Sequence, residues 1–229
     1  MATSAKPLFR ATKAKRKVHP AQTIIGNLPE QRAPEALRDP LDFDPTPWDA
    51  TAAFLDAEGE RMREIGGPVW ENACGDGRMA RELRRQGFEV YASDIVDRGW
   101  PGTVVKGFYD FKQAPIGVKI ACTNPPYNEV SARDGHGRWL RHIEDLGLDY
   151  AAMLLNWDWI AARQNGMDEL HERFPVSRAY VCCWKIDFRG KGCPPQRNAW
   201  LVWDRAWKGE TVLRRLFRER AHEQQEGLF

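Results

Sequence analysis

The residues best suited to chemistry are Asn124-Pro125-Pro126-Tyr127, which directly follow an apolar run at 118–123. A proline ring fixes the backbone and has no N–H group, so nearby carbonyl groups lack local donors. A prolyl carbonyl and the Asn124 side-chain oxygen could therefore both accept protons from one amino group. The lone pair of an exocyclic amino group is delocalised into its ring. Two such acceptors would free the lone pair from the ring and stabilise the positive charge that forms on the nitrogen during alkylation. Tyr127 offers a flat face on which a base could stack.

A second group of candidate residues lies in the glycine-rich segment Glu71–Gly77, which follows a strand pattern and opens a helix pattern. Glycine lets the backbone turn sharply and approach a ligand closely, and this setting suits a nucleotide-like ligand. The segment is not a full G-x-G-x-x-G motif, since position 80 is Ala. An ordinary strand-to-helix turn is therefore an alternative interpretation. The candidate contacts in this segment are Glu71, Asn72, Cys74, Gly75 and Gly77.

Two acidic positions follow the next two strand patterns. Asp94, with Ile95 beside it, comes about twenty residues after the glycine-rich segment, a spacing at which an acid can accept hydrogen bonds from ribose hydroxyls. Asp110-Phe111 follows the third strand pattern. There a carboxylate can accept an adenine amino group and an aromatic ring can stack on the base. Alternatively, Asp94 could cap a helix or belong to a turn. The dipeptide Asp110-Phe111 is common, so its assignment depends on its position after the third strand pattern.

The elements that must position these residues alternate between strand and helix patterns. Strands are predicted at 68–73, 88–93, 103–105, 118–123, 150–155, 179–188 and 198–203, and helices at 48–65, 78–86, 138–146 and 211–225. Thr46 is predicted to cap the first helix, with Pro47 at its first position. The alternation predicts a doubly wound, mostly parallel α/β sheet of seven strands, Rossmann-like, with an antiparallel terminal hairpin. Ligands bind at the carboxyl ends of strands in such sheets, and the motifs follow those ends.

The composition of the 229 residues is that of a soluble globular protein, with 42% hydrophobic residues, 29% charged residues and a net charge of +2. The sequence has no apolar run long enough for a transmembrane helix and no secretory signal, so a cytoplasmic protein without membrane contact is expected. Five cysteines without C-x-x-C spacing and five histidines without ligand spacing predict no metal site.

Residues 1–42 are predicted to form a flexible, basic, proline-rich arm before a single domain at 43–229. The first twenty residues carry six lysines and arginines and no acidic residue. A basic arm on a near-neutral body suits contact with a polyanion such as DNA or RNA. A solvated tail is an equal alternative.

Together, and in this order, the segments resemble the amino-group methyltransferases of the class I S-adenosylmethionine-dependent fold, which carry an N-P-P-Y motif. The resemblance covers residues 43–205. It implies S-adenosyl-L-methionine as the cofactor and 124–127 as the catalytic segment. The implied cofactor contacts are the glycine-rich segment, Asp94-Ile95, Asp110-Phe111 and Thr46-Pro47, the last of which resembles a segment that packs over the methionine end of the cofactor.

The order of the motifs is similar to that of the adenine-N6 DNA methyltransferases of the gamma arrangement, which include compact phage and prophage enzymes. The resemblance therefore implies methylation of N6 of adenine in DNA. Asn72 departs from the proline that many relatives have, and no large target-recognition domain follows Tyr127. The remaining candidates for DNA contact are the arm, the loop 128–137, Phe188 as a second stacking wall, and Arg189, Lys191 and Arg197 for phosphates.

Three alternatives remain open at this point. An RNA adenine or guanine amino-methyltransferase uses the same motif at a similar size. A protein glutamine methyltransferase also carries the motif, usually behind a helical substrate domain that the proline-rich residues 1–42 do not resemble. A non-catalytic, nucleic-acid-binding partner subunit would keep the fold but would not need every motif intact.

Overall fold

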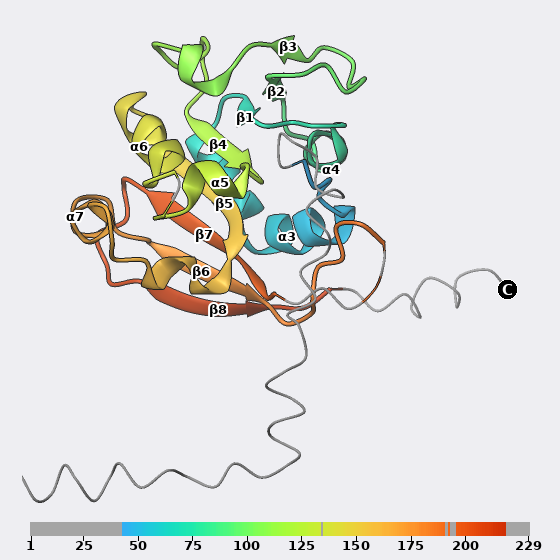
Figure 1. Ribbon diagram of the computed structural model, residues 1–229. Coiled ribbons are helices and arrows are strands. Elements are labelled where there is room, and N and C mark those ends of the chain that lie inside the picture. Colours follow the sequence, from blue (N-terminus) through green and yellow to red (C-terminus); the bar gives the residue numbers. More distant parts are fainter. Residues whose placement is uncertain (1–42, 134, 191, 193–195, 219–229) are drawn as a thin grey trace, which may run out of the picture. The chain divides into compact units, whose positions relative to one another are not determined.

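A mixed sheet of eight strands lies at the centre of the computed structural model, which describes residues 43–133, 135–190, 192 and 196–218 (Figure 1). The strand order is β3-β2-β1-β4-β5-β7-β6-β8. The bounds are β1 Val69–Glu71, β2 Val90–Asp94, β3 Val104–Val105, β4 Ile120–Thr123, β5 Tyr150–Asn156, β6 Arg178–Cys182, β7 Asn198–Asp204 and β8 Val212–Leu216. The predicted arm, residues 1–42, lies outside the described residues.

Strands β1 to β5 run parallel to one another, whereas β7 runs antiparallel between β5 and β6. This arrangement confirms the predicted α/β sheet, mostly parallel with an antiparallel pair near its end. The chain order reverses between β1 and β4, so the carboxyl ends of these two strands flank the topological switch point. The segment from Glu71 and the segment from Asn124 follow these two ends, and the fold therefore brings the two motifs side by side.

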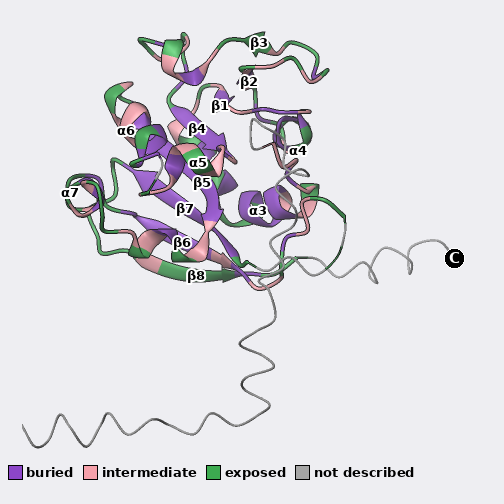
Figure 2. Cartoon of the chain, viewed as in Figure 1, coloured by how far each residue is buried: buried purple, intermediate pink, exposed green. Residues whose placement is uncertain are grey.

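Helices cover both faces of the sheet, because successive side chains of a strand point to opposite faces. Tyr150 and Ala152 of β5 belong to one buried apolar cluster, whereas Ala151 and Met153 belong to the other. Figure 2 shows buried residues in the middle strands and exposed residues on β3 and β8 at the two ends of the sheet. The first cluster includes side chains of α3 (Trp48–Ile65) and α4 (Arg78–Arg85), and the second those of α5 (Tyr127–Val130), α6 (Arg138–Asp145) and α7 (Met167–Arg173).

The last described element corrects two predictions. Val212–Leu216 form β8, not the start of a helix at 211–225, and the sheet has eight strands instead of seven. Leu213, Leu216 and Phe217 are spaced as on a helix face, but β6 would be left with an unpaired edge if they were helical. The parallel pairing of β8 with β6 satisfies that edge and buries Leu216. The predicted strand 179–188 is also shorter, since β6 ends at Cys182.

The start of α3 also differs from the prediction. Pro47, not Thr46, precedes the first helical residue, and no side chain caps the helix there. Thr46 precedes Pro47 and is buried.

A buried group of charged and hydroxyl side chains anchors α3 to the sheet. Glu58 accepts hydrogen bonds from Arg178 Nε at 2.5 Å and from the hydroxyl groups of Tyr150, at 2.9 Å, and Tyr180. Burial raises the pKa of both tyrosines, so their hydroxyl groups stay protonated and act as donors. Arg178 also donates to Asp204 at 3.1 Å. The group fixes the helix whose amino end follows Asp44 and Thr46.

We expect Glu58→Ala to lower the free energy of unfolding by about 3–5 kcal/mol, because it removes a carboxylate that pairs with the buried Arg178 guanidinium. Glu64→Ala is the matched control, since Glu64 pairs with Arg61 through a side chain that is 59% exposed, and surface pairs contribute about 0–1 kcal/mol. Urea unfolding of both variants measures the difference. Equal, small losses would show that the buried group does not hold α3.

Candidate active site

The glycine-rich segment turns between β1 and α4 and is tied to the end of β2. The Gly75 N–H group donates to Asp94 Oδ2 at 2.8 Å, and the Cys74 N–H group donates to the Ser93 carbonyl at 3.0 Å. Asp94 Oδ1 accepts from the Val96 N–H group at 3.1 Å. The Asp94 carboxylate therefore holds the glycine-rich segment at the switch point, and Ile95 beside it is 63% exposed.

Two aromatic rings lie against the glycines of this segment. Gly75 and Gly77 have φ of +53° and +77°, a backbone region that other residues rarely adopt. A Cβ atom on Gly75 would lie 2.4 Å from the Phe43 ring, and one on Gly77 would lie 2.2 Å from the Trp100 ring. The sequence showed no sign of either contact, because both rings come from segments without a motif.

Two buried polar side chains at the end of β1 retain unpaired atoms. Glu71 is 3% exposed, and its Oε2 atom has no hydrogen-bond partner among the described residues. Burial raises the pKa of this carboxyl group well above its ordinary value. Asn72 Oδ1 accepts from Trp139 Nε1 at 3.3 Å, while its Nδ2 atom is left without a partner in the same ranges. A carboxyl oxygen and an amide nitrogen are therefore buried without partners at this end of β1 in the described part of the chain.

The cysteine of this segment is buried and is not part of a disulfide within the described ranges. Burial raises the pKa of the Cys74 thiol to about 12, so the thiolate is scarce at neutral pH. Its sulfur lies 3.6 Å from Thr103 Oγ1. Cys74 packs the turn between β1 and α4.

Asp110 and Phe111 differ in solvent exposure, although they are adjacent in the chain. Asp110 belongs to a short 3-10 helix, Phe108–Asp110, and its side chain is exposed. Phe111 is 5% exposed, its ring lies edge-on to Trp70 at 4.8 Å between centroids, and Lys106 Nζ lies 4.2 Å from its centroid. The ring belongs to the core, so Phe111 does not offer the free stacking face that the sequence predicted.

Asn124 follows β4 and is oriented by the chain that precedes α3. Its Nδ2 group donates to the Asp44 carbonyl at 3.2 Å, whereas its Oδ1 atom is buried and has no partner in the described part of the chain. The Pro126 carbonyl accepts from the Glu129 N–H group at 3.0 Å as α5 begins. One end of the amide is therefore held and the other is left free to accept.

Tyr127 opens α5 and is held by the antiparallel strands. Asn198 Nδ2 donates to the Tyr127 hydroxyl at 2.9 Å and lies 3.5 Å from Asn156 Oδ1. Asn156 ends β5 and Asn198 begins β7, and the two residues face each other in the sheet. Sequence reasoning missed both asparagines, although a polar residue at each of two strand ends was a signal for them.

The residues between β6 and β7 were predicted to contact DNA, and the structure gives two of them, Phe188 and Arg189, partners within the protein. Arg189 forms a two-point ion pair with Asp44, at 2.6 and 3.2 Å, and is not a lone phosphate contact. Phe188 is half-buried and packs against the cluster that contains α3. Arg197 is exposed, and Lys191 lies outside the described residues.

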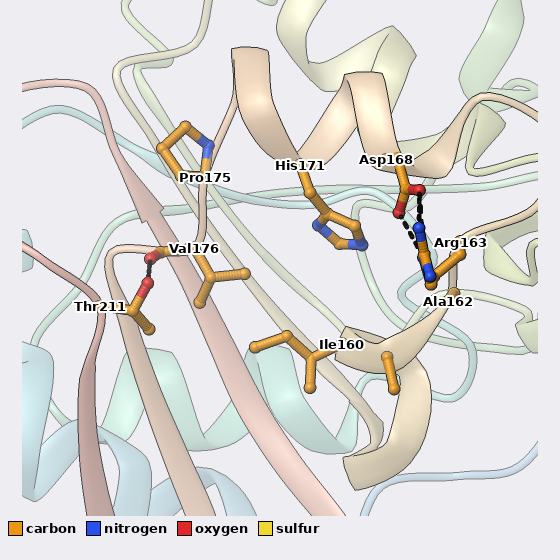
Figure 3. Close-up of a pocket in the computed structure, with 9 residues that line it drawn as sticks. Ile160, Ala162, Arg163, Asp168, His171, Pro175, Val176 and Thr211 are labelled. Carbon is orange, nitrogen blue, oxygen red and sulfur yellow. Dashed lines mark hydrogen bonds and ion pairs between the residues drawn. The ribbon is translucent and has the colours of Figure 1, made fainter. Parts of the chain in front are cut away.

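A surface hollow lies beside α7 and the segments that lead into β6 and β8 (Figure 3). Arg163 pairs with Asp168 at its rim, and burial lowers the pKa of His171 within it. None of its lining residues belongs to a motif. In the described ranges, no three His, Cys, Asp or Glu side chains are grouped as metal ligands, and no helix is long and apolar enough to cross a membrane.

No protein-family model and no curated protein matches the chain. Solved structures with a similar fold do match. A candidate RNA methyltransferase from Pyrococcus horikoshii is 14% identical, with a TM-score of 0.57 over 80% of this chain and 95% of that one. A candidate class I S-adenosylmethionine-dependent methyltransferase from Listeria monocytogenes is 14% identical, with a TM-score of 0.53 over 75% of this chain and 65% of that one.

The modification subunit of a candidate type I restriction enzyme from Vibrio vulnificus is 13% identical, with a TM-score of 0.52. The match covers 100% of this chain and 58% of the Vibrio chain. Likeness at such low identity establishes the fold and does not carry a substrate with it. The chain therefore has the fold of the class I S-adenosylmethionine-dependent methyltransferases.

Proposed function

We propose that this protein transfers a methyl group from S-adenosylmethionine to the exocyclic N6 amino group of adenine in DNA. One observation carries the proposal. The buried Asn124 Oδ1 atom has no partner in the described chain and stands at the carboxyl end of β4, beside the glycine-rich segment that follows β1. A buried acceptor without a donor is costly unless a ligand supplies one. An amino group supplies such a donor.

The chain offers a second acceptor next to Asn124. The Pro126 carbonyl already accepts from Glu129, so the Pro125 carbonyl is the one we assign to the substrate. With both amino protons accepted, the nitrogen lone pair is freed from the ring and the charge that develops on nitrogen is stabilised. Proximity and orientation supply the remaining catalysis, and no strong base is needed.

The residues around the glycine-rich segment fit the cofactor. Glu71 Oε2 and Asn72 Nδ2 are buried and unpaired in the described structure, so they can accept from and donate to a polar ligand. A cationic group beside Glu71 would favour its ionised form, against the effect of burial. Asp94 and the exposed Ile95 are assigned to the ribose and adenine side. The cofactor, when bound, supplies an electrophilic methyl group on a sulfonium centre.

DNA is the favoured substrate because the fold is also that of a modification subunit of a candidate restriction enzyme, and because N-P-P-Y with this motif order resembles adenine-N6 DNA methyltransferases. A base in duplex DNA must leave the stack to reach Asn124, at a cost of a few kcal/mol. RNA is the second candidate, since the match to the Pyrococcus horikoshii protein covers 95% of that chain.

We expect Tyr127→Phe to keep most of the activity and Tyr127→Ala to lose most of it. The phenylalanine variant keeps the ring and loses the hydrogen bond that Asn198 donates to the hydroxyl group, about 0.5–1.5 kcal/mol. The alanine variant also loses stacking of the base, about 1–3 kcal/mol. Steady-state kcat on a methyl-accepting oligonucleotide separates the two. Equal loss in both variants would assign the role to the hydroxyl group.

A tritium-transfer assay tests the function itself. Labelled S-adenosylmethionine is offered with unmethylated duplex DNA, single-stranded DNA and total RNA, and the products are identified by nucleoside mass spectrometry. N6-methyladenine in DNA is the expected product. Label in RNA alone selects the second candidate, and absence of label from every nucleic acid contradicts both.

A further inference from the structure

We propose that Arg189 is a positioning residue: through its ion pair with Asp44 it orients the Asn124 amide so that Oδ1 faces the target amino group. The inference rests on the proposed function for its kinetic consequence. It changes the role that the sequence suggested for Arg189, from contact with a phosphate to support of the catalytic amide.

The first step of the argument is the orientation of Asn124. A side-chain amide has a donor end and an acceptor end, and only the acceptor end can bind an amino proton. The donor end, Nδ2, is held by the Asp44 carbonyl at 3.2 Å, and Oδ1 is buried without a partner among the described residues. If the amide were turned over, Nδ2 would face the amino group and two donors would oppose each other. The Asp44 carbonyl therefore selects the productive orientation.

The second step is the position of Asp44 itself. Asp44 lies before α3 and outside any helix or strand, so regular backbone pairing does not fix its carbonyl. Its carboxylate accepts from Arg189 Nε at 2.6 Å and from the terminal Arg189 nitrogen at 3.2 Å. Such a two-point pair fixes direction as well as distance. Arg189 thus holds Asp44 across 145 positions of sequence.

The third step is the exposure of the pair. The Arg189 and Asp44 side chains are 31% and 29% exposed, so the pair adds little to global stability. Loss of the pair should therefore alter the local position of Asp44 without unfolding the protein. A change in turnover with an unchanged melting temperature is the signature of positioning.

The first test reads the amide directly, without substrate or cofactor. The side-chain amide signal of Asn124 in a ¹⁵N spectrum is assigned by its disappearance in Asn124→Ala. We expect Arg189→Gln to shift this signal and to speed exchange of its protons with solvent. Lys185→Gln is the matched control, because it removes an equal charge from an exposed side chain of the same segment. An Asn124 signal that is the same in Arg189→Gln and wild type overturns the proposal.

The second test is kinetic. We expect Arg189→Gln to lower kcat about tenfold with the KM for DNA unchanged, and Arg189→Lys to restore part of the loss because it keeps the charge. A raised KM for DNA with unchanged kcat and a weaker dependence on salt would make Arg189 a phosphate contact and overturn the proposal. If wild type methylates no nucleic acid, the proposed function fails, and the amide signal still decides the role of Arg189.

Discussion

Replacing Asn124 with alanine should lower kcat by about 10²–10³, the usual effect of removing one group that stabilises charge in a transition state. The variant loses the buried Oδ1 acceptor and the Nδ2 donor to Asp44. The affinity for S-adenosylmethionine should be unchanged, because Asn124 is not among the residues assigned to the cofactor. Isothermal titration with the cofactor and single-turnover methylation of DNA measure the two quantities separately.

Asn124→Asp refines this experiment, because it keeps an acceptor and removes the donor. A carboxylate beside the Asp44 carbonyl has no hydrogen to donate, so the held orientation is lost. We expect activity between that of wild type and Asn124→Ala. Gln164→Ala, which truncates an exposed amide side chain before α7 and outside every motif, should retain activity. Wild-type turnover by Asn124→Ala would refute the mechanism.

Replacing Gly77 with alanine should weaken cofactor binding, with a Kd raised by about tenfold or more. The new Cβ atom would lie 2.2 Å from the Trp100 ring, so the ring or the glycine-rich segment must move. Overpacking of this kind costs about 1–3 kcal/mol. The φ of +77° adds about 1–2 kcal/mol for any residue with a Cβ atom.

Gly87→Ala separates strain from collision. Gly87 has a φ of +87°, and its Cβ position has nothing within 4 Å, so this variant carries the backbone strain alone. We expect Gly87→Ala to lower stability by about 1–2 kcal/mol and to bind the cofactor normally. The double variant Gly77→Ala/Trp100→Ala should recover part of the affinity. If Gly77→Ala binds the cofactor as tightly as wild type, the glycine-rich segment is not the cofactor site.

The parts of this protein that depend on short-range pattern can be predicted from the sequence. Strand and helix periods alternate from Val69 to Asn156, and that alternation predicted the parallel half of the sheet. The polar residues at strand ends, Asp94 and Asn124 among them, also follow from pattern, because such sheets present their carboxyl ends at one edge. Short-range pattern therefore predicts where the candidate site lies in the sheet.

Tertiary structure alone decided what depends on distant partners. Leu213, Leu216 and Phe217 have helical spacing, yet Leu213 and Leu216 belong to β8, which pairs with the edge of β6, and Phe217 follows that strand. Phe111 follows a strand end, as a stacking residue would, yet its ring packs against Trp70 in the core. Both outcomes depend on which neighbour needs a hydrogen bond or an apolar contact, and local sequence does not specify that neighbour.

The same reason explains the ion pair and the buried group. From sequence alone, Arg189 is a basic residue in a solvated loop. The folded chain pairs it with Asp44, which is 145 positions away in the sequence. From sequence alone, Glu58 is one of several charged residues on α3. In the structure it accepts hydrogen bonds from Arg178 and two tyrosines. Sequence determined the positions of the chemistry in this protein. Only the folded chain decided which charges are paired, which rings are buried and which end of the Asn124 amide is left to accept, because those outcomes arise from contacts between segments far apart in the chain.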